Sequence, residues 1–192
     1  VSGVAALIFG AALGMVSLLI LYHFTKPLAA VVALSANAFY VLVYTLCLKR
    51  HTVQNIVIGG AAGAVGPLIG WAAITGDLGW PAWVLFAIIF LWTPPHFWAL
   101  ALKYQRDYAA ANVPMMPVVR GEETTRRQMF GYTLSLFPAV ISLAWFGEAG
   151  AVYLVVSLAA TAWFAWKAWV LMRTRSLAAA MRELLRLSPS KT

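Results

Sequence analysis

The chain has little charge for its length and a single cysteine. Only 10% of its 192 residues are charged, whereas roughly 25% of the residues in soluble domains are charged. This scarcity excludes an ordinary soluble domain. One cysteine, Cys47, excludes a disulfide framework and a cysteine-rich metal site. Because Cys47 lies in an apolar stretch, we expect it to be a small buried side chain.

Long apolar segments take up most of the chain, which is 62% hydrophobic with a mean hydropathy of +0.82. A membrane-spanning helix needs roughly 20 mostly apolar residues. Six segments qualify: 4–22, 27–48, 53–75, 80–102, 129–146 and 151–172. The sequence therefore predicts an all-α polytopic transmembrane bundle over residues 1–176. An amphipathic, truncated cytoplasmic tail is predicted for residues 177–192.

The basic residues gather in alternate loops. The formal net charge is +8, which in a soluble protein would suggest nucleic acid. Here the basic residues follow the second, fourth and sixth apolar segments, so no nucleic-acid partner is expected, and the lipid bilayer is the expected one. By the positive-inside rule these loops face the cytoplasm, or the matrix if the protein is mitochondrial. The opposite loops hold Lys26, Asp77 and Glu148.

Glycines recur in the third apolar segment at a spacing typical of packed membrane helices. Gly59 and Gly63 are four residues apart, as are Gly66 and Gly70. Such spacing lets neighbouring helices approach closely, so we interpret these glycines as packing residues. Asn55, just inside the same segment, is polar in an apolar setting and needs a partner or a ligand.

Polar chemistry is concentrated between Trp92 and Arg127. Trp92-Thr-Pro-Pro-His96 is predicted to break the end of the fourth segment. His96 has two interpretations: it satisfies backbone carbonyls freed by the two prolines, or it contacts a haem or another substrate. Asp107 is either a solvated partner of nearby basic residues or a carboxylate for a Mg²⁺ ion that carries a diphosphate.

Basic side chains on the same predicted side of the membrane also have two interpretations. They extend toward lipid headgroups, or they neutralise a phosphate leaving group, for which arginine suits two-pronged contact. They are Lys49, Arg50, Arg106, Arg120, Arg126 and Arg127.

Several motifs occur in order and together resemble a known family. They are Tyr44-Thr-x4-Arg50, Asn55-Ile-Val-Ile-Gly-Gly60, Pro67-Leu-Ile-Gly-Trp71, Trp92-Thr-Pro-Pro-His-Phe97, Asp107-Tyr108 and Val113-Pro-Met-Met-Pro-Val-Val119. The stretch from Gly10 to Tyr132 is similar to the protoheme IX farnesyltransferases, also called haem O synthases. This group is a branch of the UbiA-type intramembrane prenyltransferases.

The resemblance implies a fold, a reaction and a set of site residues. The fold is a bundle of about nine transmembrane helices around a cavity that opens to lipid. The reaction transfers a farnesyl group from farnesyl diphosphate to the vinyl group of haem b, giving haem O, with Mg²⁺ held between two Asp-rich sites and the diphosphate. The expected location is the bacterial cytoplasmic membrane. Asp107, Lys49 and Arg50 are the expected catalytic residues, with Asp107 on the metal. The expected substrate-binding residues are Asn55, His96, Arg106, Tyr108 and Arg120.

The chain departs from the family pattern at several points. The family's first Asp-rich motif and its early helices are expected before Val1, and its last helix beyond Thr192. Gly66 stands where the family usually has a proline. We therefore expect an internal portion, equivalent to the third to eighth spans, that does not catalyse transfer alone. Two alternatives stay open: a prenyltransferase with a quinone-type acceptor, and a transporter or non-catalytic membrane module.

Overall fold

The computed structural model describes residues 2–146 and 149–173, which contain helices and no strand. The all-α prediction is therefore confirmed for this part of the chain. The tail predicted for residues 177–192 lies outside the described residues. The elements are α1 (Gly3–Phe24), α2 (Pro27–Ala38), η1 (Phe39–Leu48), α3 (Asn55–Gly63), α4 (Gly66–Thr75), α5 (Trp80–Lys103), α6 (Gln105–Ala110), α7 (Met116–Val119), α8 (Gly121–Trp145) and α9 (Ala151–Arg173).

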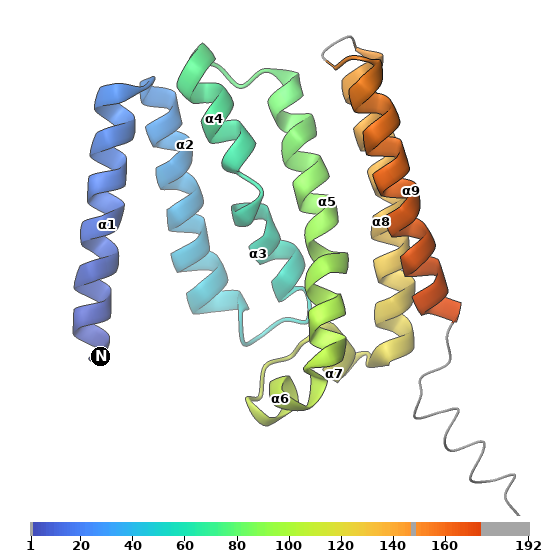
Figure 1. Cartoon of the computed structure of the whole chain (residues 1–192). Coiled ribbons are helices and arrows are strands. Elements are labelled where there is room, and N and C mark those ends of the chain that lie inside the picture. Colours follow the sequence, from blue (N-terminus) through green and yellow to red (C-terminus); the bar gives the residue numbers. More distant parts are fainter. Residues whose placement is uncertain (1, 147–148, 174–192) are drawn as a thin grey trace, which may run out of the picture.

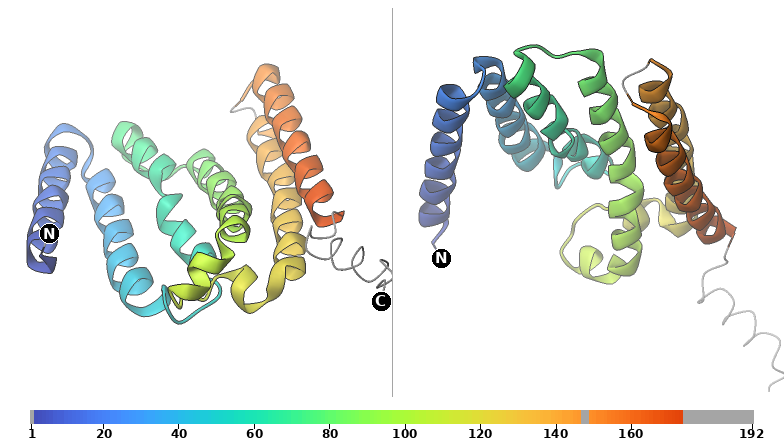
Figure 2. Two further views of the ribbon diagram at one scale, coloured as in Figure 1. Left: turned by 60° about the horizontal axis from the view of Figure 1, so that its bottom comes forward. Right: turned by 45° about the horizontal axis from the view of Figure 1, so that its top comes forward.

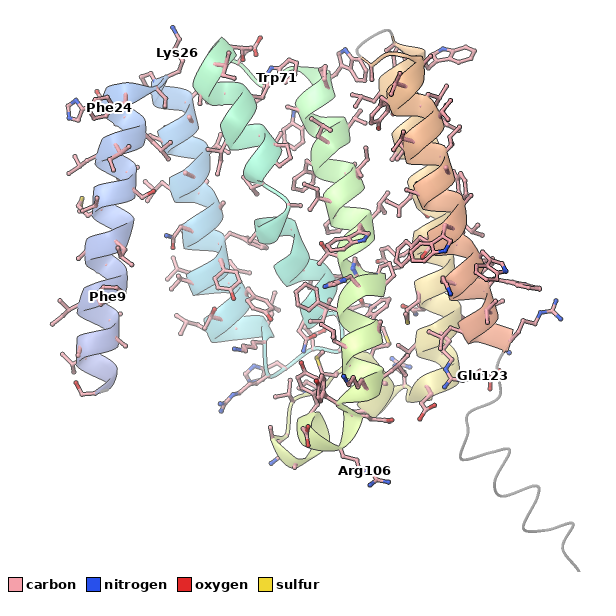
Figure 3. The ribbon with its side chains drawn as sticks, in the orientation of Figure 1. Phe9, Phe24, Lys26, Trp71, Arg106 and Glu123 are labelled. Atoms are coloured by element: carbon pink, nitrogen blue, oxygen red, sulfur yellow. The ribbon has the colours of Figure 1, made fainter. Side chains whose placement is uncertain are left out.

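The long helices stand side by side in a curved row (Figures 1 and 2). Helix α2 contacts α1 and α4, α5 contacts α3, α4 and α8, and α8 contacts α9. The short helices α6 and α7 lie at one end of the row (Figure 1). We call this the basic end, because the loops rich in basic residues, 49–54 and 103–127, lie there. Lys26 and Trp71 lie at the opposite end from Arg106 and Glu123, as Figure 3 shows.

Five helical segments are long and apolar enough to cross a membrane: Gly3–Phe24, Pro27–Leu48, Asn55–Thr75, Trp80–Lys103 and Ala151–Arg173. The chain is an integral membrane protein. The remaining expected span, 129–146, falls in the apolar part of α8. That helix begins at Gly121 and carries charged residues in its first turns. By length and composition, α8 is not one of the five candidate membrane spans. A sixth membrane span therefore stays a prediction.

Helix α5 passes straight through Pro94 and Pro95, so the predicted break at this point is wrong. A proline inside a helix removes one backbone donor, but membrane helices tolerate this where neighbours pack around it. Both prolines are buried, and the hydroxyl of Thr93 donates a hydrogen bond of 2.7 Å to the carbonyl of Ile89. Dense packing around the two prolines keeps the helix continuous.

The second span changes from α-helical to π-helical winding at Phe39, which the sequence did not predict. The amide of Lys49 donates to the carbonyl of Tyr44, five residues back, at 2.8 Å. On this segment the rings of Tyr40 and Tyr44 lie 5.1 Å apart. Cys47 is exposed on the same segment, so its expected burial is wrong. π-Helical turns are rare and frequently occur at functional sites.

The glycine-rich span is divided into α3 and α4, and its glycines play different parts. A Cβ at Gly59 would lie 2.5 Å from Cε2 of Tyr44, and one at Gly60 would lie 2.8 Å from Cγ2 of Thr93. The predicted close packing is therefore confirmed at Gly59, and Gly60 packs closely as well. The prediction is wrong at three positions, where an added Cβ would meet nothing within 4 Å: Gly63, Gly66 and Gly70.

Candidate functional site

An aromatic cavity of about 620 Å³ lies between the second span, α3 and α5. Its wall combines large rings with very small residues, which leave the space open. The rings belong to Tyr40, Tyr44, Trp92 and Phe97, and the small residues are Gly59, Gly60, Ala62 and Gly63. Tyr40 and Tyr44 both belong to the π-helical segment, so this segment forms part of the wall. Such a cavity suits an apolar chain.

Asn37 on α2 brings an amide side chain to the aromatic cavity. Within residues 2–146 and 149–173 this side chain makes no hydrogen bond, so its donors and acceptor are available to a ligand. Polar residues within membrane spans are costly and usually functional. Asn37 was not predicted as a site residue, although it is a polar residue in an apolar span, which is the feature that singled out Asn55. Tyr40, Tyr44 and Trp92 were also missed.

His96 lies beside this cavity. Its ring is exposed and stacks on the ring of Trp92, with centroids 4.3 Å apart and planes at 21°. The ring of Phe97 meets it edge-on at 5.4 Å. His96 makes no hydrogen bond to a carbonyl in the described part of the chain, so it does not satisfy carbonyls freed by the prolines. An exposed imidazole on an aromatic wall can contact a flat ligand.

Asp107 and Arg106 lie on the short helix α6 at the basic end, and both side chains are exposed. Figure 3 shows Arg106 pointing away from the bundle. The ion pairs of the described residues join Glu122 to Arg126 and Glu123 to Arg127, and none includes Asp107. The structure therefore does not bring Asp107 into contact with a basic partner, and its carboxylate is open to a ligand.

The other loop carboxylate, Asp77, is already engaged by its neighbours. The Thr75 hydroxyl donates to its Oδ1 at 2.7 Å, and the Trp71 indole N–H donates to the same oxygen at 3.0 Å. These hydrogen bonds, the one from Thr75 first, lower the pKa of Asp77. Asp77 lies at the opposite end of the bundle, so it is a structural carboxylate with no part in the basic end.

The described residues suit one of the two ways in which proteins bind Mg²⁺. No group of three or more His, Cys, Asp or Glu side chains among residues 2–146 and 149–173 could hold a metal ion. A cage made of these protein ligands alone is therefore not formed. Mg²⁺ also binds through one or two carboxylates together with substrate phosphates and water. Asp107, exposed and unpaired, suits that second mode.

Asn55 has a structural partner at the basic end. It is 1% exposed, and its Nδ2 donates to the carbonyl of Lys49 at 3.2 Å. This bond fixes the turn that carries Lys49 and Arg50, whose side chains are exposed. Asn55 was expected to have either a protein partner or a ligand, and the structure shows a protein partner. Its Oδ1 is buried without a hydrogen bond in the described structure.

Tyr108 and Arg120 lie in different surroundings at the basic end. Tyr108 is half-buried on α6, next to Asp107, in the neighbourhood of Tyr44. The direct link between the aromatic cavity and the basic end is the hydrogen bond of 2.8 Å from the Lys49 amide to the Tyr44 carbonyl. Arg120 lines a separate hollow with residues 51–54. The structure therefore places Tyr108 near the aromatic cavity and Arg120 elsewhere.

The fold and the cavity define an integral membrane protein of the polytopic α-helical class. Residues 1–188 match the UbiA prenyltransferase family, and the chain belongs to that family.

Curated relatives carry the name protoheme IX farnesyltransferase. The chain is 57% identical over 158 residues to the one from Gloeobacter violaceus, covering 82% of this chain and 52% of the relative. It is 50% identical over 184 residues to the one from Trichodesmium erythraeum, covering 95% of this chain and 56% of the relative. The chain thus spans about half the length of the curated relatives it matches. No solved structure matches it.

Proposed function

We propose that this chain takes part in transferring a farnesyl group from farnesyl diphosphate to the vinyl group of haem b, giving haem O. The relatives' names supply the reaction. The observation that carries the proposal is an aromatic cavity whose wall residue Tyr44 accepts a hydrogen bond of 2.8 Å from the amide of Lys49, at the basic end. Farnesyl diphosphate needs an apolar environment for its chain and a basic one for its diphosphate, and the two must be adjacent.

The aromatic cavity would hold the farnesyl chain. Burying a methylene group contributes about 0.8 kcal/mol, so an apolar hollow favours a long prenyl chain over water. Excluding water also protects an allylic cation from hydrolysis. The faces of Tyr44, Trp92 and other wall rings attract positive charge, so they would stabilise that cation.

The basic end would hold the diphosphate. In the reaction the carbon–oxygen bond of farnesyl diphosphate breaks, and the diphosphate leaves with the electron pair. Lys49, Arg50 and Arg106 would stabilise the charge that develops on it. Mg²⁺, when bound, supplies further positive charge there, and Asp107 is the residue that would hold it.

The vinyl π electrons of haem b would form the new carbon–carbon bond. The cation left beside the porphyrin ring is captured by water, which then loses a proton, so the product carries a hydroxyl group beside the new carbon–carbon bond. No protein nucleophile is required. His96 and Trp92, stacked at the cavity edge, would place the flat acceptor. The basic end would face the cytoplasm, in the bacterial cytoplasmic membrane.

The test is product formation by the intact gene product that contains these residues. The purified protein is incubated with farnesyl diphosphate and Mg²⁺, with haem b or a quinone-type aromatic acceptor. We expect a haem product heavier than haem b by a farnesyl group and a hydroxyl group, and none with heat-inactivated protein. Prenylation of the quinone-type acceptor alone would contradict the choice of haem b. No prenylated product with either acceptor would contradict the prenyltransfer itself.

A further inference from the structure

A second hollow lies at the basic end, and nothing in the proposed reaction uses it. It has a volume of about 490 Å³ and shares no lining residue with the aromatic cavity. We call it the polar cavity. It lies between the turn at residues 51–54, α7 and the first turns of α8. Its polar lining consists of His51, Thr52, Gln54, Arg120, Thr124 and Gln128.

The charge of the polar cavity suits an anion. None of the described residues that line it is acidic. Arg120 is exposed and has no ion-pair or hydrogen-bond partner in the described part of the chain. By contrast, Arg127 on the neighbouring helix is paired with Glu123. An unpaired guanidinium beside hydroxyl and amide donors is the arrangement that binds phosphate oxygens.

The same lining also argues against a metal-bound diphosphate as the occupant. A Mg²⁺ ion that carries a diphosphate needs at least one carboxylate, and Asp107 does not line the polar cavity. The Nδ1–H of His51 donates a hydrogen bond of 2.8 Å to the carbonyl of Cys47. A phosphate group held by Arg120 without a metal fits these groups better.

A shallower groove continues from the polar cavity along α8. Gln128 lines both, and the groove, of about 340 Å³, is completed by Gly131, Tyr132 and Ser135. The spacing i, i+3, i+4, i+7 places these residues on one face of the helix. They lead from the charged start of α8 toward its apolar part. At Gly131 an added Cβ would meet nothing within 4 Å, so the groove is open there.

We propose that the polar cavity and this groove bind an anionic phospholipid, with its phosphodiester beside Arg120 and an acyl chain along α8. A polar hollow that continues into a groove on a helix at the basic end matches a molecule with an anionic head and an apolar tail. Anionic lipids are also attracted to the basic face of a membrane protein. This inference does not depend on the proposed reaction, because the polar cavity is lined neither by residues of the aromatic cavity nor by Lys49, Arg50, Arg106 or Asp107.

The test is lipid binding by the delipidated intact gene product in detergent, measured by native mass spectrometry. Phosphatidylglycerol, phosphatidylcholine and soluble glycerol phosphate are titrated in turn. We expect phosphatidylglycerol to bind most tightly. Arg120→Gln should weaken it by roughly tenfold or more, the scale of a lost charged hydrogen bond. Arg127→Gln, which removes an equal charge outside the cavity, should change the affinity by less than about twofold.

A second variant tests the groove and separates the two sources of phosphate. Gly131→Leu places a side chain in open space, so it should fold, and it should weaken phosphatidylglycerol while leaving glycerol phosphate unchanged. Equal losses in Arg120→Gln and Arg127→Gln would overturn the proposal, because attraction would then be a property of the whole surface. Soluble glycerol phosphate binding as tightly as the lipid would overturn the lipid assignment.

Discussion

The ring of Tyr44 occupies the space that a side chain on Gly59 would need: a Cβ there would lie 2.5 Å from Cε2 of the ring. Gly59 belongs to α3 and Tyr44 to the π-helical segment, and both line the aromatic cavity. The absence of a side chain on one helix therefore sets the position of a ring on the other. This pair holds one wall of the cavity in place.

Replacing Gly59 with alanine should displace the Tyr44 ring and reduce turnover. Overpacking of this kind costs about 1–3 kcal/mol of stability. The matched control is Gly70→Ala in α4, a residue that does not line the aromatic cavity and where an added Cβ meets nothing within 4 Å. Thermal unfolding and product formation are measured for both variants. Equal behaviour of the two would contradict the role of the close contact.

Asp107→Ala should lower turnover by roughly a hundredfold or more, in line with the loss of other groups that stabilise charge in a transition state. The carboxylate is exposed and has no ion-pair partner among the described residues, so its removal should leave the fold intact. Asp77→Asn, at the opposite end, is the control and should retain turnover. Turnover of Asp107→Ala within a few-fold of the parent would exclude this role.

His96→Ala should weaken the binding of haem b while farnesyl diphosphate binding persists. The reason is that His96 is exposed and its ring stacks on Trp92 at the cavity edge. Haem absorbance and a separate binding assay with radiolabelled farnesyl diphosphate measure the two affinities. The control is His23→Ala, at the other end of the bundle. Equal loss of both ligands would indicate that His96 supports the local fold instead.

Cysteines placed at Arg106 and at Asp77 should be labelled from opposite sides of the membrane. The two positions lie at opposite ends of the bundle, and the basic end should face the cytoplasm. The background is Cys47→Ser, because the native thiol is exposed. A membrane-impermeant thiol reagent is applied to intact cells and to inverted vesicles. Labelling of both positions from one side would contradict the topology.

The helical bundle was predictable because long apolar segments and alternating loop charges are properties of short stretches of sequence. Proline effects were less predictable: Pro94 and Pro95 signal a break, but burial of both rings keeps α5 continuous. The π-helical winding from Phe39 has no residue signature of its own. It depends on how the second span packs.

The candidate site was predictable in part for a similar reason. Asp107 and His96 stand out in the sequence because they are polar residues in an apolar chain. The aromatic cavity was not predicted, because its wall comes from three separate segments that meet only in the fold. Asn37 was missed for another reason. A polar residue within a membrane span indicates a functional position, but the sequence does not show whether its side chain faces a cavity.

Photolabelling tests whether the aromatic cavity holds the farnesyl chain. A farnesyl diphosphate analogue with a photoreactive group in its tail is bound to the intact gene product, irradiated, and mapped by peptide mass spectrometry. We expect labels on the peptides that carry Tyr40, Tyr44, Trp92 and Phe97, and their loss when excess farnesyl diphosphate competes. Labels confined to the outer helices α1 and α9, with none in the cavity, would contradict the account.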